Sequence, residues 1–142
     1  MTKDVLITIT GLQYAVGEES AEPVEVVIPG QYYNKQGQHF LVYDEVMEEN
    51  DEVTHNLVKF KSHKMEVSRK GMVTVQMIFE ENKKNLSYYR TPFGLINMGI
   101  AATGIHVEEQ EEKINVRVEY ALDMNDAYVA DCTLNMSIQA IH

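Results

Sequence analysis

Residues 114–140 read INVRVEYALDMNDAYVADCTLNMSIQA, and this stretch decides the fold. Apolar and polar side chains alternate along residues 114–122 and again along residues 128–140, with the short tip Met124-Asn125-Asp126 between the two runs. Successive side chains of a strand point to opposite faces, so each run predicts a strand with one buried and one solvated face. The stretch therefore predicts an antiparallel hairpin.

The same alternation recurs along the chain, and short turns separate the runs. Two of these turns, at residues 34–37 and 68–71, end in glycine, as a type I turn with a glycine bulge requires. The predicted strands cover roughly residues 3–16, 23–34, 38–47, 53–61, 63–69, 72–80, 85–91, 94–107, 113–123 and 127–140. Short connections favour an antiparallel meander. Residues 94–105, rich in Gly, Ala and Ile, are compatible with a strand or a helix.

A meander of this length favours closure. Twist accumulates from strand to strand and free edges invite aggregation, and a closed barrel removes both problems. Pro29-Gly30, Gly99 and Gly104 interrupt strand-like runs, so we predict that the strands bend there. We expect one all-β domain over residues 1–142, a closed antiparallel barrel of about 8–10 strands.

Composition narrows the class of protein. The 142 residues include one cysteine, Cys132, and carry a formal net charge of −10. An intrachain disulfide is excluded, and no apolar run approaches the roughly 18 residues that span a membrane, so we expect a cytoplasmic protein without membrane contact. Nucleic acid is a poor partner for an acidic chain, because phosphate binding depends on lysine and arginine displacing counterions.

Basic side chains concentrate in one segment. Residues 59–90 hold eight basic and three acidic side chains, whereas the rest of the chain holds four basic and 19 acidic ones. Consecutive strands of a meander are neighbours, so outward side chains there predict one positive patch that docks an acidic partner or another copy. The alternative is a solvated face that balances acidic neighbours across the sheet. The patch residues are Lys59, Lys61, Lys64, Arg69 and Lys70.

No pattern in the sequence indicates catalysis or a bound cofactor. The five histidines show no i, i+2 pair and no His-Glu-x-x-His spacing, so no metal site is predicted. Neither a glycine-rich phosphate loop nor a hydrolase elbow occurs, and no catalytic residue is assigned. Cys132 lies on the apolar row of its strand, which favours a small buried hydrophobe over a nucleophile.

The interior of the barrel is the predicted place for a ligand. The chain has eight methionines, whose flexible thioethers suit a cavity that repacks around an apolar guest. They also suit an irregular core without a guest. The interior residues that we expect to line a pocket are Tyr43, Met77, Phe79, Tyr120 and Met136.

Several segments carry a family resemblance. They are Gly30-Gln31-Tyr32-Tyr33, Phe40–Glu45, Val67–Gly71, Thr91–Leu95 and Ile114–Leu122. On these segments the sequence resembles the YwiB-like proteins, bacterial β-barrels of unassigned function that are grouped with the calycin, or lipocalin-like, barrels. The resemblance implies a lipocalin-like fold and brings no activity with it. The chain lacks the Gly-x-Trp of true lipocalins, because it has no tryptophan.

Two functional hypotheses follow from these observations. The first is a barrel that binds a small apolar or amphipathic molecule in its interior, which rests on closure and on the resemblance. The second is an interaction or regulatory module that acts through the basic outer patch of residues 59–90.

Overall fold

The computed structural model describes residues 2–11, 25–46, 52–71, 74–91 and 94–141. These residues form strands and no helix, so none of them belongs to a helix that could cross a membrane. The strands are β1 (Thr2–Thr10), β2 (Glu25–Lys35), β3 (Gln38–Val46), β4 (Val53–Lys61), β5 (Lys64–Lys70), β6 (Thr74–Glu80), β7 (Lys83–Thr91), β8 (Gly94–Glu109), β9 (Lys113–Met124) and β10 (Ala127–Ala140). Residues 94–105 are therefore strand.

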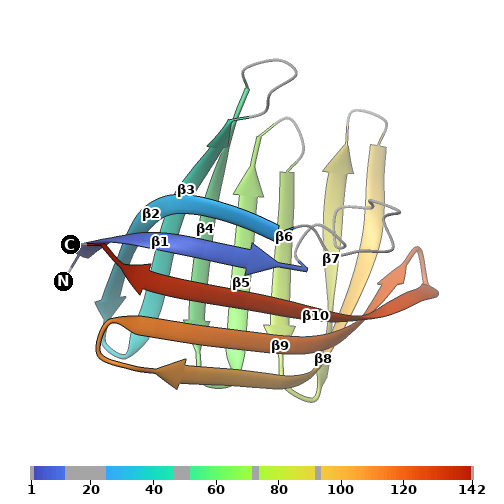
Figure 1. The fold of residues 1–142 in the computed structure, drawn as a ribbon. Helices are drawn as coiled ribbons and strands as arrows, with labels where there is room; N and C mark the ends of the chain where they lie inside the picture. The colour runs from blue at the N-terminus through green and yellow to red at the C-terminus, as the bar shows by residue number, and fades with distance from the viewer. Residues whose placement is uncertain (1, 12–24, 47–51, 72–73, 92–93, 142) are drawn as a thin grey trace.

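Each strand pairs antiparallel with its neighbour in sequence, and β1 pairs with both β2 and β10. The order β1-β10-β9-β8-β7-β6-β5-β4-β3-β2 closes the barrel (Figure 1). The all-β closed meander predicted from the alternation is confirmed. The predicted first strand extends to residue 16, but residues 12–16 lie outside the described part of the chain.

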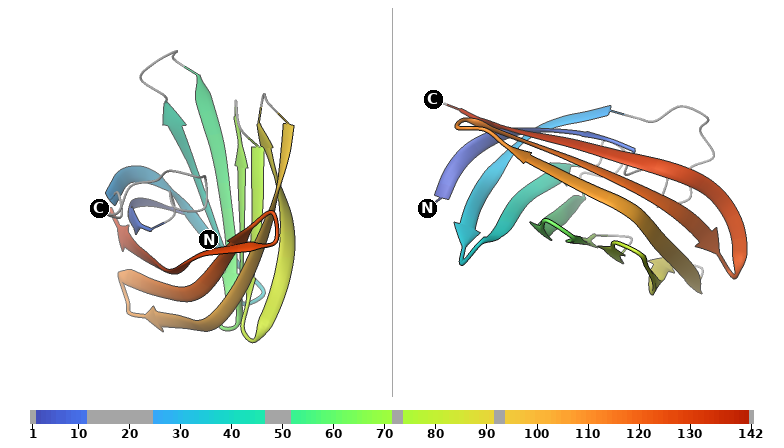
Figure 2. Two further views of the ribbon diagram at one scale, coloured as in Figure 1. Left: turned by 90° about the vertical axis from the view of Figure 1, so that its right-hand side faces the viewer. Right: turned by 90° about the horizontal axis from the view of Figure 1, so that it is seen from below.

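The strands form two crossing layers. In Figure 1, β3 to β7 run nearly upright at the back, whereas β1, β9 and β10 run across the front. The long strand β8 belongs to both layers, because it begins upright and then bends across the front (Figure 2). Its register with β9 shifts between Ala102 and Gly104, which is the bulge that a strand needs in order to turn a barrel corner. Gly104 is thus the bend that the sequence predicts.

The predicted Pro29-Gly30 step marks where β2 gains its second neighbour. The β2 strand pairs with β1 on both sides of this step, but its ladder with β3 begins only at Gln31. Pro29 has no N–H group to donate. This costs no hydrogen bond to β3, because the β2–β3 ladder starts only at Gln31. A Cβ at Gly30 would lie 2.6 Å from Ile7 Cδ1 and 2.7 Å from the Val42 carbonyl oxygen, so only glycine permits this approach.

The β2–β3 turn differs from the sequence expectation. Lys35 and Gln38 are partners, and the two residues between them, Gln36 and Gly37, have φ values of 54° and 82°. Two consecutive positive φ values define a type I′ turn, whereas the sequence predicted a type I turn with a glycine bulge. A type I′ turn matches the twist of its strands, which explains its use in a two-residue hairpin.

The weakest seam of the described barrel lies between β6 and β7. Their ladder consists of only two residue pairs, Thr74 with Arg90 and Val75 with Tyr89. Toward the β6–β7 turn the chain bonds elsewhere, because the Glu81 amide donates to the His63 carbonyl and the Asn82 amide donates to the Ala102 carbonyl. The β6–β7 seam therefore has the shortest ladder of the described barrel.

Inward side chains of β3, β4, β5 and β6 form rows across the sheet, because cross-strand partners share a face. From the β2–β3 turn upward, three rows are His39, Phe60, Met65 and Phe79; Leu41, Val58, Val67 and Met77; and Tyr43, Asn56, Arg69 and Val75. The middle row is entirely apolar and fully buried. The interior therefore has an apolar centre with polar groups on either side of it along β3.

Candidate functional site

The predicted ligand-lining residues all face the interior and pack into the core. Tyr43, Met77, Phe79, Tyr120 and Met136 are each at most 3% exposed. The rings of Phe79 and Tyr120 meet edge to face, with centroids 4.9 Å apart. At this burial the five side chains are shielded from solvent and belong to the hydrophobic core. Met136 also lines a hollow of about 360 Å³ with residues of β1, β8, β9 and β10.

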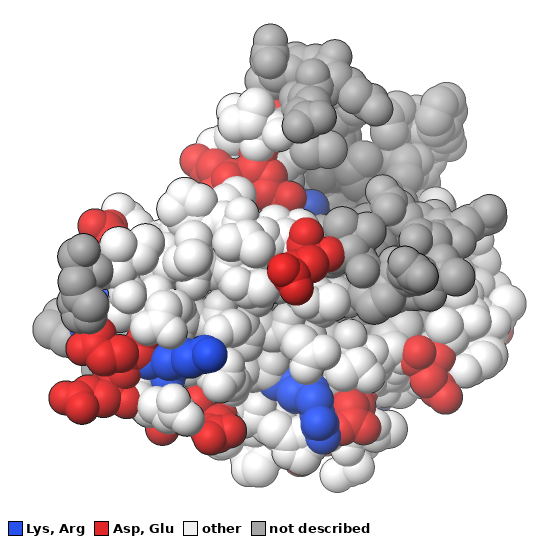
Figure 3. Space-filling model, viewed as in Figure 1, with Lys and Arg blue, Asp and Glu red and all other residues white. Residues whose placement is uncertain are grey.

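A cavity of about 230 Å³ lies at one end of the barrel, where β1 begins, β10 ends and the β8–β9 turn crosses. We call it the end cavity. Its lining is Lys3, Val5, Tyr32, Asn34, Glu109, Gln110, Glu111, Glu112, Lys113, Ile114, Ile138 and Ala140. Apolar side chains of β1, β9 and β10 form part of the wall, and the exposed turn residues 110–112 form part of the rim. Acidic side chains gather at this end, at the lower left of Figure 3.

Beside the end cavity, three side chains form a hydrogen-bonded chain that we call the histidine chain: Tyr32, His39 and Glu109. The His39 ring is buried and stacks on Phe60, with ring centroids 4.5 Å apart. Its Nε2 lies 2.8 Å from Glu109 Oε1, and its Nδ1 lies 2.7 Å from the Tyr32 hydroxyl. The histidine chain thus connects the exposed Glu109 carboxylate to the half-buried Tyr32 phenol through the buried His39 imidazole.

The partners of His39 fix its tautomer. A carboxylate only accepts, so Nε2 carries the hydrogen and donates to Glu109. Nδ1 then accepts from the Tyr32 hydroxyl, and Asn34 Nδ2, at 3.5 Å, is a second donor facing the same nitrogen. Burial lowers the pKa of His39, an effect that the Glu109 carboxylate opposes. Every contact is therefore consistent with a neutral imidazole whose two nitrogens are satisfied.

Farther along β3, a second polar group crosses the interior. Tyr43 is the cross-strand partner of Asn56, and Asn56 is the partner of Arg69, so the three form one inward row across β3, β4 and β5. We call these three residues the polar row. Glu45, the next inward residue of β3, accepts from Arg69 Nη2 and from Asn56 Nδ2, each at 3.2 Å. Arg69 and Glu45 therefore form an ion pair inside the end of the barrel, with side chains 12% and 19% exposed.

The polar row is incompletely hydrogen-bonded. Asn56 Nδ2 also donates to the Thr54 carbonyl, and because both of its partners are acceptors, the orientation of the amide is fixed. Three shielded atoms of the row have no partner, namely Tyr43 Oη, Asn56 Oδ1 and Arg69 Nη1. Burial raises the pKa of Tyr43, so its hydroxyl keeps its proton. Unpaired buried polar atoms are rare in folded proteins, and here three occur in one row.

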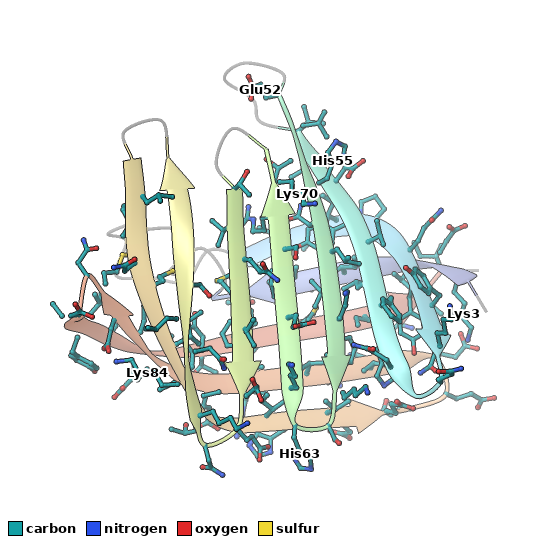
Figure 4. The ribbon with its side chains drawn as sticks, turned by 180° about the vertical axis from the view of Figure 1, so that it is seen from behind. Lys3, Glu52, His55, His63, Lys70 and Lys84 are labelled. Carbon is teal, nitrogen blue, oxygen red and sulfur yellow. The ribbon has the colours of Figure 1, made fainter. Side chains whose placement is uncertain are left out.

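The residues of the predicted basic patch lie in three different places in the structure. Arg69 points into the barrel, so its assignment to the outer patch is wrong. Figure 4 shows Lys70 beside His55, toward the opposite strand ends from His63. Lys61 and Lys64 are partners on either side of the turn that carries His63. Lys59, Lys61 and Lys64 line a hollow of about 250 Å³ together with Gln38 and Glu66, and we call it the lysine hollow.

Neither polar group includes two other residues of the barrel strands whose chemistry could serve a site, Cys132 and Arg117. Cys132 is a free, buried cysteine, and burial raises the pKa of its thiol. No three His, Cys, Asp or Glu side chains among the described residues stand together as a metal site. Arg117 lies on the outer face and pairs with Glu119 at 3.1 Å. The Thr91-Pro92-Phe93-Gly94 turn includes residues 92 and 93, which lie outside the described residues.

Neither polar group was predicted from the sequence, although the two-residue period places Arg69 and His39 on the inner face. Arg69 has the parity of Met65 and Val67, which face inward. His39 likewise has the parity of Leu41. The identity of their partners has no such signal, because Glu109 joins His39 only after β8 has bent around the barrel.

Comparisons with known proteins support the fold. A family model described as "Domain of unknown function (DUF1934)" matches residues 7–136. No curated protein matches the sequence. The chain is similar to the crystal structure of the ywiB protein from Bacillus subtilis, with 21% sequence identity, a TM-score of 0.69, and coverage of 99% of this chain and 91% of that chain. At this identity the likeness shows a shared fold, and it confirms the resemblance that the sequence segments indicated.

Proposed function

The chain belongs to the DUF1934 family, whose function is unknown, and from its geometry we propose that it binds a small amphipathic molecule in the end cavity. The observation that carries this proposal is a cavity with apolar side chains on one part of its wall and fixed polar groups on another. Ligand sites are usually concave and mostly apolar, with a few placed polar groups that orient the guest. Because the side chains of the barrel centre are buried in the core, we place the guest in the end cavity.

The wall of the end cavity suits a guest that has one apolar part and one polar part. Val5, Ile114 and Ile138 are nearly fully buried and offer an apolar surface. Tyr32 and Glu109 lie on the same lining, and their contacts with His39 hold them in place before a ligand arrives. A preorganised site loses less side-chain entropy on binding, so these contacts support affinity for a polar group.

The volume limits the size of the guest. Pockets for drug-sized molecules typically measure about 300–1,000 Å³, whereas the end cavity measures about 230 Å³. A short-chain fatty acid or a single-ring aromatic acid suits this space, whereas haem or a long acyl chain exceeds it. Lysine and glutamate side chains both occur on the lining, so the polar part of the guest is not restricted to one sign of charge.

A thermal-shift screen with short-chain fatty acids and single-ring aromatic acids tests the proposal. A ligand present at a hundred times its Kd adds about 2.7 kcal/mol to the stability of the folded state. Ala140→Phe places a ring into the cavity lining and should abolish the shift. The matched control is Ala121→Phe on β9, whose partner on β10 is the exposed Asp131 on the outer face.

Two results would reject the end cavity as the site. One is a hit that shifts the melting temperature of the Ala140→Phe variant as much as that of the parent. The other is a hit that the Ala121→Phe control also loses, since this would reveal a general loss of stability. A screen without any hit would equally count against a binding function at this end.

The lysine hollow supports a second candidate function, the docking of an acidic partner or another copy. Three lysines converge there on a protein of net charge −10. Glu66 lies directly opposite Lys59, and Glu80 lies directly opposite Lys64, which weakens the positive field. Reversing charge at Lys59 and Lys61 should release an acidic partner in a pull-down, and reversal at Lys70 serves as the control. Partners unchanged by the first pair of substitutions would exclude the lysine hollow.

We also propose a cytoplasmic location. Its support is a single cysteine, Cys132, which is buried and makes no disulfide. Reducing compartments keep such thiols free. Fractionation of cells that express the protein would test this directly, and recovery from an oxidising compartment would contradict it.

A further inference from the structure

The polar row presents three unpaired groups in a fixed order across the sheet. Tyr43 on β3 offers a hydroxyl donor, Asn56 on β4 offers an amide oxygen as acceptor, and Arg69 on β5 offers the N–H donors of Nη1. The order is therefore donor, acceptor, donor. This pattern is not interchangeable, because Asn56 Nδ2 is already committed to Glu45 and to the Thr54 carbonyl.

The complement of this pattern is acceptor, donor, acceptor. A carbonyl, an N–H and a second carbonyl in succession provide it, which is the edge of a cyclic imide such as succinimide, hydantoin or uracil. The Tyr43 hydroxyl and Arg69 Nη1 would each donate to one carbonyl oxygen. The imide N–H would donate to Asn56 Oδ1. One small planar group thus carries the complement of each unpaired atom of the row.

Charge argues against a carboxylate or an amine as the group that binds the polar row. Arg69 is already neutralised by Glu45, whose Oε1 lies 3.2 Å from Nη2. A carboxylate placed on the row would add an uncompensated negative charge inside the barrel, and an amine would add a positive one; both are costly in a shielded site. A neutral group with strong acceptors and one donor is favoured, and an imide is neutral near pH 7.

The position of the row gives it a route to solvent. Its three unpaired atoms are shielded, but the side chains of Arg69 and Glu45 remain 12% and 19% exposed. Beneath the row lies the fully buried apolar layer formed by Leu41, Val58 and Val67, so a ring contacts this layer only after the partly exposed side chains of Arg69 and Glu45 move aside. We propose that the polar row is a binding site for the imide edge of a small neutral ring. This site is separate from the end cavity and does not depend on it.

A titration with uracil, followed by two-dimensional NMR of the intact protein, tests this proposal. Uracil should shift backbone resonances around Tyr43, Asn56 and Arg69. The matched probe is 3-methyluracil, which keeps both carbonyls but lacks the N–H between them. It should bind at least about tenfold more weakly, since one hydrogen bond to a buried acceptor is lost.

Two variants identify the site on the protein. Tyr43→Phe removes only a hydroxyl without a partner, so the fold is retained, and uracil should bind about tenfold more weakly. Tyr120→Phe is the control, because Tyr120 is also buried but lies on β9, outside the row, with its hydroxyl near the Cys132 thiol. Its affinity for uracil should equal that of the parent.

The proposal is overturned by any of three outcomes. The first is that uracil, succinimide and hydantoin leave the resonances of the row unshifted at millimolar concentration. The second is that the N-methylated probe binds as tightly as uracil. The third is a crystal structure grown with uracil that shows only ordered water at Tyr43 Oη and Arg69 Nη1, which would assign the three unpaired atoms to hydration.

Discussion

Two inward residues of β3, His39 and Tyr43, carry polar groups into the same barrel, but only one of them finds all its partners within the chain. They lie four residues apart, which is about 13 Å along a strand, with Leu41 between them. Both imidazole nitrogens of His39 are bonded, to Tyr32 and to Glu109. The Tyr43 hydroxyl and two further atoms of its row are bonded to nothing.

This difference distinguishes a group with a structural role, the histidine chain, from a group with atoms available to a ligand, the polar row. The histidine chain is complete, so it fixes the wall of the end cavity without requiring a ligand. The polar row is incomplete, because three of its buried polar atoms have no hydrogen-bond partner in the folded chain. The end cavity and the unmet hydrogen bonds therefore lie at different places in the barrel. The proposed amphipathic site follows from the space, and the proposed imide site follows from the unpaired atoms.

The largest expected effect comes from breaking the ion pair that supports the polar row. Arg69→Met leaves the Glu45 carboxylate without its cation in a shielded place, and it should lower the free energy of unfolding by about 3–5 kcal/mol. Urea denaturation measures the change. Adding Glu45→Gln should recover more than about 1 kcal/mol, since the two residues are coupled.

Arg117→Met is the matched control for that prediction. Its guanidinium also pairs with a glutamate at 3.1 Å, but the two side chains are 56% and 44% exposed. Solvent screens such a pair, so its loss should change stability by less than about 0.5 kcal/mol. Equal losses for the two arginine variants would show that Arg69 is not buried as described.

Removing the centre of the histidine chain should have the next largest effect. His39→Leu leaves the Tyr32 hydroxyl without its acceptor and removes the stack on Phe60, at a cost of about 1–3 kcal/mol. His55 also contacts a carboxylate at 2.8 Å, that of Asp44, but is exposed. His55→Leu should cost less than about 0.5 kcal/mol. A cost for His55→Leu as large as that for His39→Leu would contradict the distinction.

The same histidine predicts a dependence of stability on pH. Burial lowers the pKa of His39 below its ordinary value of 6.5, so at intermediate pH the unfolded chain binds a proton that the folded chain does not. Its contribution to stability is therefore present above that value and is lost as the pH falls below it. Melting temperatures between neutral and mildly acidic pH should fall less steeply for His39→Gln than for the parent. An unchanged slope would show that His39 titrates as it does in the unfolded chain.

The smallest expected effect is that of Tyr43→Phe without ligand. Its hydroxyl has no partner to lose, so the free energy of unfolding should stay within about 0.5 kcal/mol of the parent or rise. Tyr120→Phe should behave in the same way. A loss of more than about 1 kcal/mol for Tyr43→Phe alone would reveal a bond that the structure does not contain.

The fold was predictable because one period governs the whole chain. Alternation along β9 and β10 predicts the buried sides of both strands, and the predicted bend at Gly104 coincides with a register shift in the structure. The same alternation also places Arg69 inside. Its charge alone favours the outer face, because arginine is rarely buried without a partner.

The candidate sites were not predictable to the same degree. Glu45 and Arg69 are 24 residues apart in sequence, and Tyr32 and Glu109 are farther apart still. Whether such groups meet depends on strand register and on the bulge in β8, and alternation alone fixes neither. Packing likewise decides that Met77 and Phe79 fill the centre and that space remains near Ala140.

An atomic-resolution crystal structure of the protein tests the central claim most directly, because it shows which polar atoms the chain leaves unpaired. In crystals grown with uracil, the account predicts density for the ring, and not for water alone, within hydrogen-bonding distance of Tyr43 Oη and Arg69 Nη1. It also predicts direct contacts, with nothing inserted, from Tyr32 through His39 to Glu109. Side chains of the protein itself bonded to all three atoms of the polar row would contradict it.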